Sequence, residues 1–132
     1  MKKNKAFKFR LYPNDNQAKQ LSNNFGSCRF VFNYFLTLSK QVYEDEHKCL
    51  YYNDYAKMLV SLKEEKPFLK EVDSISLQQS LRHLDGAFKS FLKYPANGYP
   101  KYKRKILHND TYSTICVNNN IAIIDNKHIK LL

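Results

Sequence analysis

Residues 7–12 alternate strictly between apolar and polar side chains, and this short pattern constrains the fold more than any other. The apolar side holds Phe7, Phe9 and Leu11, and the polar side holds Lys8, Arg10 and Tyr12. Alternation at period two indicates a half-buried β-strand, which ends at a proline because proline lacks a backbone donor. A lone strand is not stable by itself, so this one needs partner strands from elsewhere in the chain.

Helical spacing dominates the middle of the sequence. A first helix, capped by Asn14 or Asp15, is predicted to run to about residue 24. Gly26 then interrupts the pattern, and a second helix is predicted to continue to about Glu46. Two helices around a glycine are typical of a helix-turn-helix, although any αα-hairpin shows the same arrangement.

Two further helices are predicted after this pair. One is capped by Asn53 or Asp54 and runs to about Lys66, where Pro67 stops it. The other starts at Asp73 or Ser74 and has the clearest pattern in the chain, because its apolar residues recur at helical spacing. These apolar residues are Leu77, Leu81, Leu84, Phe88 and Phe91.

The pattern returns to strands after the helices. Strand-like runs cover residues 112–117, 121–124 and 129–132, and polar turn residues separate them. The strand at residues 7–12 is expected to join these late strands in one sheet or barrel. The order of elements therefore predicts an α+β fold in which a helical block is inserted between strands.

Positive charge is concentrated at the two ends of the chain. The formal net charge is +10; residues 1–12 hold five basic and no acidic groups, and residues 94–132 hold six basic and two acidic groups. The middle, with eleven basic and ten acidic groups, is nearly neutral. Segregated charge of this kind favours a polyanion as partner, nucleic acid before an anionic membrane.

Several classes of protein and site are excluded by pattern. No apolar run approaches the roughly 20 residues that span a bilayer, and no signal-peptide region is present, so we expect a cytoplasmic protein without a membrane partner. Cys28, Cys49 and Cys116 are odd in number and far apart, which argues against a disulfide framework and a zinc site. No phosphate-binding loop, nucleophile elbow or zinc-protease motif occurs, so we predict no catalytic residue, no metal ligand and no cofactor.

Two polar motifs are candidates for contact with nucleic acid. Residues 99–105 interleave two tyrosines with four cations, which suits phosphate neutralisation and base stacking, although a solvated linker has the same composition. Gln78 and Gln79 lie near the start of a helix, where glutamine can recognise adenine, but a solvent-facing glutamine is the simpler interpretation. Tyr51 and Tyr52 fit either a satellite core or base stacking.

Five collinear stretches of the sequence resemble the N-terminal third of TnpB proteins. They cover residues 5–13, 26–33, 71–73, 77–81 and 99–103. TnpB proteins are transposon-encoded, and several are RNA-guided DNA nucleases. The resemblance implies a helical recognition bundle inserted into a partial oligonucleotide-binding-like β-barrel. Its parts would be residues 1–13 with the first barrel strand, 14–95 as the recognition insertion, 96–109 as a basic linker, and 110–132 as returning strands of an incomplete barrel.

The same resemblance implies partners and site residues. The expected partners are DNA and a transposon-derived guide RNA; the oligomeric state is not set by the sequence. The DNA-reading candidates are Tyr52, Ser74, Ile75, Gln78 and Asn118. The candidates for contact with a nucleic-acid backbone are Lys5, Lys8, Arg10, Lys101, Lys103, Arg104 and Lys105.

The TnpB family continues beyond the position of Leu131 into a RuvC-like nuclease domain, whereas this sequence ends at Leu132. We therefore expect a nucleic-acid-binding fragment that does not cleave, hence not an enzyme by itself. One alternative is a stand-alone helix-turn-helix regulator, or a nuclease-lacking decoy of the transposon. Another is an enzyme subunit whose nuclease half is supplied by a second chain.

Overall fold

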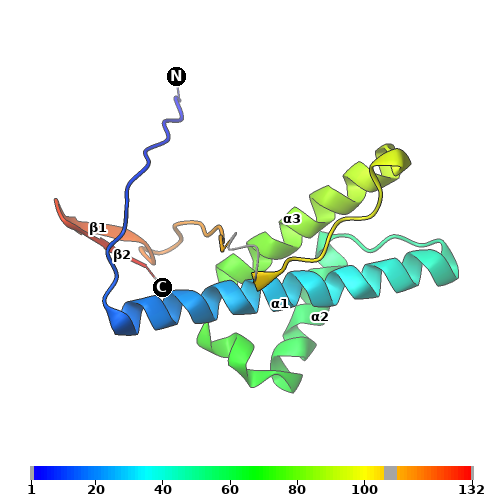
Figure 1. Ribbon diagram of the computed structural model, residues 1–132, viewed down its shortest axis with the longest axis horizontal. Coiled ribbons are helices and arrows are strands. Elements are labelled where there is room, and N and C mark those ends of the chain that lie inside the picture. Colours follow the sequence, from blue (N-terminus) through cyan, green and yellow to red (C-terminus); the bar gives the residue numbers. More distant parts are fainter. Residues whose placement is uncertain (1, 106–109, 132) are drawn as a thin grey trace.

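The computed structural model describes residues 2–105 and 110–131 (Figure 1). Helices come first in the chain and a small sheet comes last, which confirms the α+β prediction at the level of element types. The elements, in order, are α1 (Asp15–Glu46), α2 (Tyr52–Glu65), the 3-10 helix η1 (Pro67–Glu71), α3 (Ser74–Lys93), the 3-10 helix η2 (Pro95–Asn97), β1 (Ala122–Asp125) and β2 (His128–Lys130).

Helix α1 is a single helix of 32 residues, so the prediction of two helices separated at Gly26 is wrong. Its start is the predicted one: Asn14 and Gln17 form a capping box, with both backbone N–H groups bonded at 2.9 Å. A glycine inside a helix costs about 1 kcal/mol relative to alanine. The buried face of α1 continues from Asn24 past Gly26 to Ser39, and its packing outweighs that cost.

The end of α2 and the start of α3 confirm the predicted signals, whereas the predicted cap of α2 at Asn53 or Asp54 is wrong, because α2 begins at Tyr52 and Tyr51 is its N-cap. Pro67 follows the end of α2 and begins η1. Asp73 caps α3, since its side chain accepts a hydrogen bond from the Ile75 backbone N–H at 3.1 Å. Within the described residues, no helix combines the length and the apolar character that a membrane-spanning helix needs.

One hydrophobic core holds the helices together. Burying each of its large side chains contributes about 1.5–3 kcal/mol, so this core is the main source of stability among the described residues. A buried hydrogen bond of 2.6 Å between the Ser39 and Tyr55 hydroxyls joins α1 to α2. The core residues are Cys28, Val31, Phe32, Phe35 and Leu36 of α1, Tyr55, Leu59 and Leu62 of α2, Leu69 of η1, and Leu77, Leu81 and Leu84 of α3.

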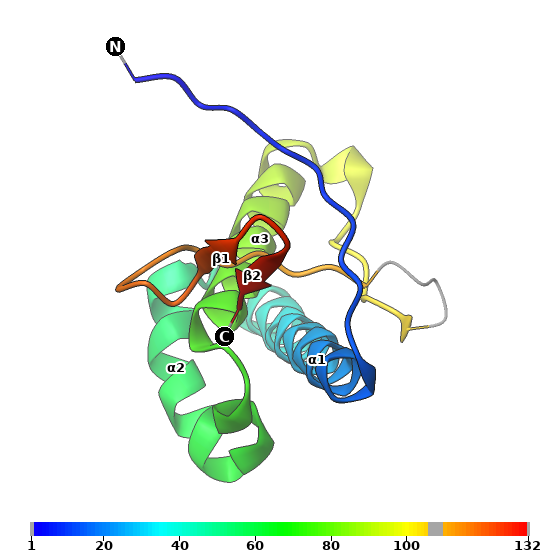
Figure 2. The ribbon, with the colours of Figure 1, turned by 90° about the vertical axis from the view of Figure 1, so that its left-hand side faces the viewer.

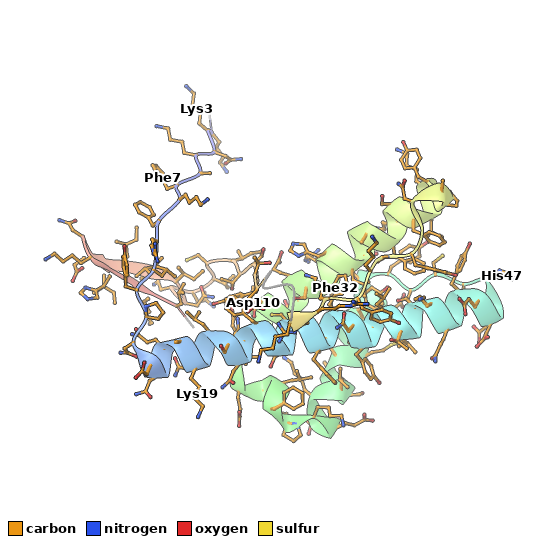
Figure 3. All side chains as sticks on the ribbon, in the orientation of Figure 1. Lys3, Phe7, Lys19, Phe32, His47 and Asp110 are labelled. Atoms are coloured by element: carbon orange, nitrogen blue, oxygen red, sulfur yellow. The ribbon has the colours of Figure 1, made fainter. Side chains whose placement is uncertain are left out.

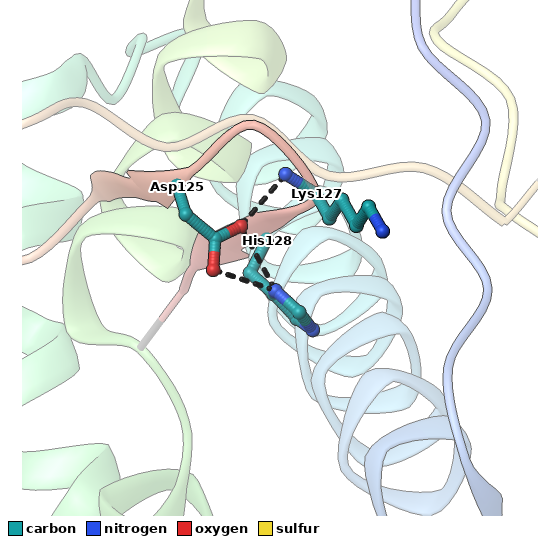
Figure 4. A network of polar contacts seen from close by, with 3 residues as sticks. All are labelled: Asp125, Lys127 and His128. Atoms are coloured by element: carbon teal, nitrogen blue, oxygen red, sulfur yellow. Dashed lines mark hydrogen bonds and ion pairs between the residues drawn. The ribbon is translucent and has the colours of Figure 1, made fainter.

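Strands β1 and β2 form an antiparallel hairpin that lies beyond the N-terminal end of α1 (Figures 1 and 2). Ile123 pairs with Ile129, and Ala122 pairs with Lys130. The Asp125 carboxylate orders the turn: it accepts the Lys127 backbone N–H at 2.7 Å and contacts the His128 ring at 3.0 Å (Figure 4). These strands match two of the predicted runs, residues 121–124 and residues 129–132. Residue 132 lies outside the described residues.

Two other predicted strands are not formed. Residues 7–12 run away from the helices as extended chain, with Phe7 and Phe9 exposed (Figures 1 and 3). Residues 112–117 pass over the helices instead of pairing with the hairpin. The Tyr112 ring packs on Phe25, with ring centroids 5.5 Å apart, and the Thr114 hydroxyl donates to Asp73 at 2.5 Å. Alternation indicates a strand, but strand formation also needs a paired neighbour.

The domain boundaries expected from the resemblance stay predictions. Helices α1 to α3 lie within residues 14–95, and residues 2–13 and 110–131 show one two-stranded hairpin and no barrel. The end of the predicted basic linker, residues 106–109, lies outside the described residues. The barrel therefore stays a prediction.

Candidate nucleic-acid interface

Residues 99–105, here called the basic strap, lie along α1 and are fixed by hydrogen bonds. The Asn33 side chain bonds both backbone groups of Lys103: its Oδ1 accepts the N–H at 2.8 Å and its Nδ2 donates to the carbonyl at 2.9 Å. The Thr37 and Tyr102 hydroxyls lie 2.9 Å apart and are hydrogen-bonded. The backbone of the strap is therefore held in one position before any ligand arrives.

An aromatic cluster anchors the first residue of the basic strap. The Tyr99 ring stacks on Phe91 with centroids 4.5 Å apart, and Tyr43 and Phe88 close the cluster. The Lys40 ammonium lies 5.0 Å from the Tyr99 ring centroid. Desolvation, and then the nearby Glu44 carboxylate, raise the pKa of the Tyr99 phenol. This tyrosine stays neutral and acts as an anchor.

The strap presents its cations to solvent. The Lys103 ammonium lies 4.7 Å from the Phe32 ring centroid, so its stem covers the core while its charge stays outside. All four predicted backbone-contact residues of the strap are exposed, and they are Lys101, Lys103, Arg104 and Lys105. Exposed cations on a fixed backbone are suited to meeting phosphates.

A groove of about 1050 Å³ runs between the start of α1, the junction of η1 and α3, and the hairpin. Its walls carry four cations, Arg29, Lys105, Lys127 and Lys130, and two carboxylates, Glu71 and Asp73. Of the four cations, the sequence singled out Lys105 alone. The charge excess of residues 94–132 was the signal that could have identified the two hairpin lysines. No local pattern identified Arg29, because it stands alone between apolar and small residues and belongs to no run of cations.

Arg29 links the large groove to a smaller one of about 270 Å³. The small groove is also lined by Tyr102, Lys103 and Arg104 of the strap. The Arg29 guanidinium forms an ion pair of 2.9 Å with Asp110, which lies beside α1 in Figure 3. A cation shared by both grooves is thus partly neutralised by a carboxylate of this chain.

The first turns of α3 carry three of the predicted DNA-reading residues, Ser74, Ile75 and Gln78. Gln78 is half-buried and Ser74 is exposed. One turn further along the same face lies Arg82, whose guanidinium carbon is 3.9 Å from the centroid of the Tyr52 ring. Arg82, which the sequence did not single out, therefore connects Tyr52 on α2 to the Gln78 face of α3.

Asn118 lies in a separate turn. It and Asn119 have left-handed backbone angles, with φ of 54° and 60°. The buried Asn120 side chain fixes this turn, since its Oδ1 accepts the Val117 N–H at 2.6 Å and its Nδ2 donates to the Ile115 carbonyl at 3.1 Å. Among the described residues, no hydrogen bond joins Asn118 to the face of α3.

The predicted cations of the N-terminal segment lie apart from the helices. Lys5, Lys8 and Arg10 are all exposed on extended chain, and Figure 3 shows Lys3 and Phe7 of the same segment projecting away from the helical body. The Arg10 guanidinium lies 5.5 Å from the Tyr12 ring. The structure thus separates the N-terminal cations from the strap.

The cysteines are free thiols in the described structure. Burial raises the pKa of the Cys28 thiol, while hydrogen bonds from Ser76 and Ser80 oppose that rise. A buried, protonated thiol behaves as a small apolar side chain. Within residues 2–105 and 110–131, no group of three or more His, Cys, Asp or Glu side chains is arranged to hold a metal ion.

Comparison with known proteins gives one family match and several relatives. A helix-turn-helix domain family, of the OrfB type, matches residues 1–48. The described part of this region consists of extended chain up to Asn14, the unbroken helix α1, and the two residues that follow it.

The relatives fall into long and short proteins. The chain is 41% identical over 103 residues to a candidate RNA-guided DNA endonuclease of Streptomyces pristinaespiralis, and the match covers 76% of this chain and 25% of that protein. It is 37% identical over 107 residues to the candidate RNA-guided DNA endonuclease InsQ of Escherichia coli strain K12, covering 80% and 26%. It is 33% identical over 111 residues to the virulence protein VsdF of Salmonella dublin, covering 76% of this chain and 93% of VsdF.

This chain therefore spans about a quarter of the length of the two endonuclease relatives and nearly all of VsdF. The family resemblance seen in the sequence motifs is confirmed by these matches. The chain belongs to the TnpB family of transposon-associated, DNA-binding proteins.

Proposed function

We propose that this chain is a recognition module that binds target-adjacent DNA and a transposon-derived guide RNA, and that it does not itself cleave. The observation that carries the proposal is the basic strap. Its four cations stand on a backbone that Asn33 and Thr37 fix against α1. Because the strap is ordered in advance, binding a phosphate backbone requires little further ordering of the protein.

Two kinds of contact divide the work of recognition. The strap, with Lys5, Lys8 and Arg10, neutralises phosphates and so sets affinity without regard to sequence. The face of α3 that carries Ser74, Ile75 and Gln78, with Tyr52 and Asn118, provides selectivity for the DNA motif. We place this activity in the cytoplasm, together with the transposon and its transcript.

We also propose that residues 7–12 complete a partial barrel with the hairpin. Support comes from complementary exposed surfaces: Phe9 is 80% exposed and Ile123 is 82% exposed. Each surface would bury apolar area if the two strands paired. The resulting barrel would bring Lys8 and Arg10 to the same body as the strap.

The names of the two longer relatives describe them as RNA-guided DNA endonucleases. For this chain, the question is which part of such an activity it would supply. The chain matches about a quarter of each of them. We propose that it supplies the recognition part of such an activity, while the nuclease part lies in the remaining three quarters of those relatives.

Binding of the full chain to a labelled DNA duplex and to transposon RNA, across a range of salt concentrations, tests the proposal. We expect affinity to fall steeply with salt, with a logarithmic slope of about 0.9 per neutralised phosphate on B-form DNA. Replacing Lys101, Lys103, Arg104 and Lys105 with glutamine should reduce that slope. Replacing Lys57, Lys63, Lys66 and Lys70, which lie on α2 and around η1, is the charge-matched control. A slope near zero for the unmodified chain would contradict the proposal.

A regulator or decoy that acts alone is the second candidate. It is favoured by the similarity to VsdF, a protein that this chain matches over 93% of its length. Protection of one defined duplex site by a dimer would favour the regulator. Co-purification of a specific transposon RNA, compared with a charge-matched control variant, would favour the recognition module.

A further inference from the structure

The contact between Arg82 and Tyr52 is the closest cation–aromatic contact among the described residues. The guanidinium carbon lies 3.9 Å from the ring centroid, while the other contacts of this kind range from 4.7 to 5.5 Å. A guanidinium at this distance is stacked on the ring. The long Arg82 side chain, which is otherwise exposed, is therefore held in one orientation.

The donors of Arg82 stay available for a ligand. Its nearest acidic neighbour in sequence, Asp85, pairs instead with Lys89 at 3.0 Å. Among residues 2–105 and 110–131, Arg82 forms no ion pair. An aromatic face attracts the cation but accepts few of the five N–H groups of arginine, so the guanidinium fork remains open.

Arg82 continues the row of polar residues at the start of α3. Ser74, Gln78 and Arg82 are spaced by four residues and so lie on one side of the helix. The row is about 12 Å long at 1.5 Å per residue. It fits within a major groove, which is about 12 Å wide in B-form DNA.

We propose that Arg82 reads a guanine in duplex DNA and that Tyr52 is its positioning residue. Arginine can donate two parallel hydrogen bonds to O6 and N7 of guanine, which is the most common specific contact to a base. The inference rests on the proposed DNA binding and specifies one base of the site. We expect a guanine opposite Arg82, next to the position that Gln78 faces. It also changes the role of Tyr52, because one face of its ring is already occupied by the guanidinium.

Selection from duplexes with randomised positions, using the full chain, tests this inference. For Arg82→Ala we expect the affinity for guanine-containing preferred sites to fall about 5- to 150-fold, the range expected for one bidentate base contact. Affinity for other sequences should change little. Lys93→Ala, which removes one charge from the other end of α3, is the control and should keep the preference.

Variants of Tyr52 separate positioning from general packing. Tyr52→Phe keeps the ring and should keep the guanine preference, whereas Tyr52→Ala should lose it to the same extent as Arg82→Ala. Thermal unfolding of each variant shows whether the fold is intact. If Arg82→Ala does not fold, Arg82→Lys decides, because lysine keeps the charge but lacks the planar fork.

The outcomes distinguish this inference from the proposed function. A uniform loss of affinity over all sequences would show that Arg82 contacts phosphate, and an unchanged preference would show that it contacts nothing; either result overturns the inference and leaves DNA binding intact. Failure of the unmodified chain to bind any duplex would overturn the proposed function itself.

Discussion

Helices α1 to α3 bury a continuous apolar core, whereas residues 2–13 and 110–131 leave nearly all of their large apolar side chains exposed. Both regions have clear hydrophobic periodicity in the sequence. The difference lies in hydrogen bonding: a helix satisfies its backbone groups within itself, but a strand needs a neighbour. A periodic apolar pattern is therefore enough to predict a helix in the helical body, whereas at the two ends of the chain a strand forms only where a partner strand is present.

The largest effect expected is on the core. Leu81→Ala should lower the free energy of unfolding by about 2–5 kcal/mol, because Leu81 is fully buried and its loss leaves a cavity. Ile123→Ala in the exposed hairpin should change it by no more than about 0.5 kcal/mol. Urea unfolding followed by circular dichroism measures both. Equal losses would mean that the hairpin packs as tightly as the helices, and the contrast between the two regions would fail.

A smaller effect is expected where the basic strap meets α1. Asn33→Ala removes both hydrogen bonds to the Lys103 backbone, each contributing about 0.5–1.5 kcal/mol. Hydrogen exchange at residues 101–104 should become faster by a corresponding factor, and affinity for a DNA duplex should fall. Asn97→Ala, at an exposed position of η2, is the matched control. Unchanged exchange in Asn33→Ala would show that the strap is held in another way.

Gly26→Ala tests whether α1 is one helix. An alanine Cβ at this position would lie 3.7 Å from the Arg29 side chain, an ordinary contact, so the substitution should stabilise the protein by about 1 kcal/mol. Gly86→Ala on α3, where a Cβ meets nothing within 4 Å, should act in the same direction. Destabilisation by Gly26→Ala alone, measured by thermal unfolding, would indicate a turn at that point.

The smallest effect expected is a pH dependence of the hairpin. The Lys127 backbone N–H, followed by the His128 side chain, holds the pKa of Asp125 below its ordinary value of 3.8. A lowered pKa in the folded state means that the contribution of Asp125 is complete above that value and is lost as the pH falls below it. The Lys127 amide resonance should report this loss by NMR, and Asp125→Asn should abolish it. A transition that persists in Asp125→Asn would contradict this assignment.

Most of the helical body could be predicted from the sequence. The stripe from Leu77 to Phe88, the cap at Asp73 and the end at Pro67 are local signals, and all three hold in the structure. The predicted break at Gly26 was wrong because the low helix propensity of glycine is a small effect. The buried residues of α1 before and after Gly26 outweigh it. The strand predicted at residues 112–117 does not form, because Tyr112 packs on Phe25 of α1 and Thr114 bonds Asp73 at the start of α3, and no local pattern reveals these partners.

The residues of the candidate site also fall into those that a local sequence pattern could predict and those that it could not. The basic strap was visible as a run of cations, and Gln78 as a polar residue near a helix start. Arg29 and Arg82 were not visible, since their significance comes from Asp110 and Tyr52, residues 81 and 30 positions away. Contacts between distant residues are the part of a site that composition and spacing do not encode.

The bonds between Asn33 and Lys103 also have a consequence for the order of folding. They join residues 70 positions apart, whereas the hydrogen bonds of α1 and α3 are local. Local contacts form early, and long loops close later. In a refolding chain the helices can therefore assemble before the strap docks, and we expect such a chain to acquire its core first and its affinity for phosphates last.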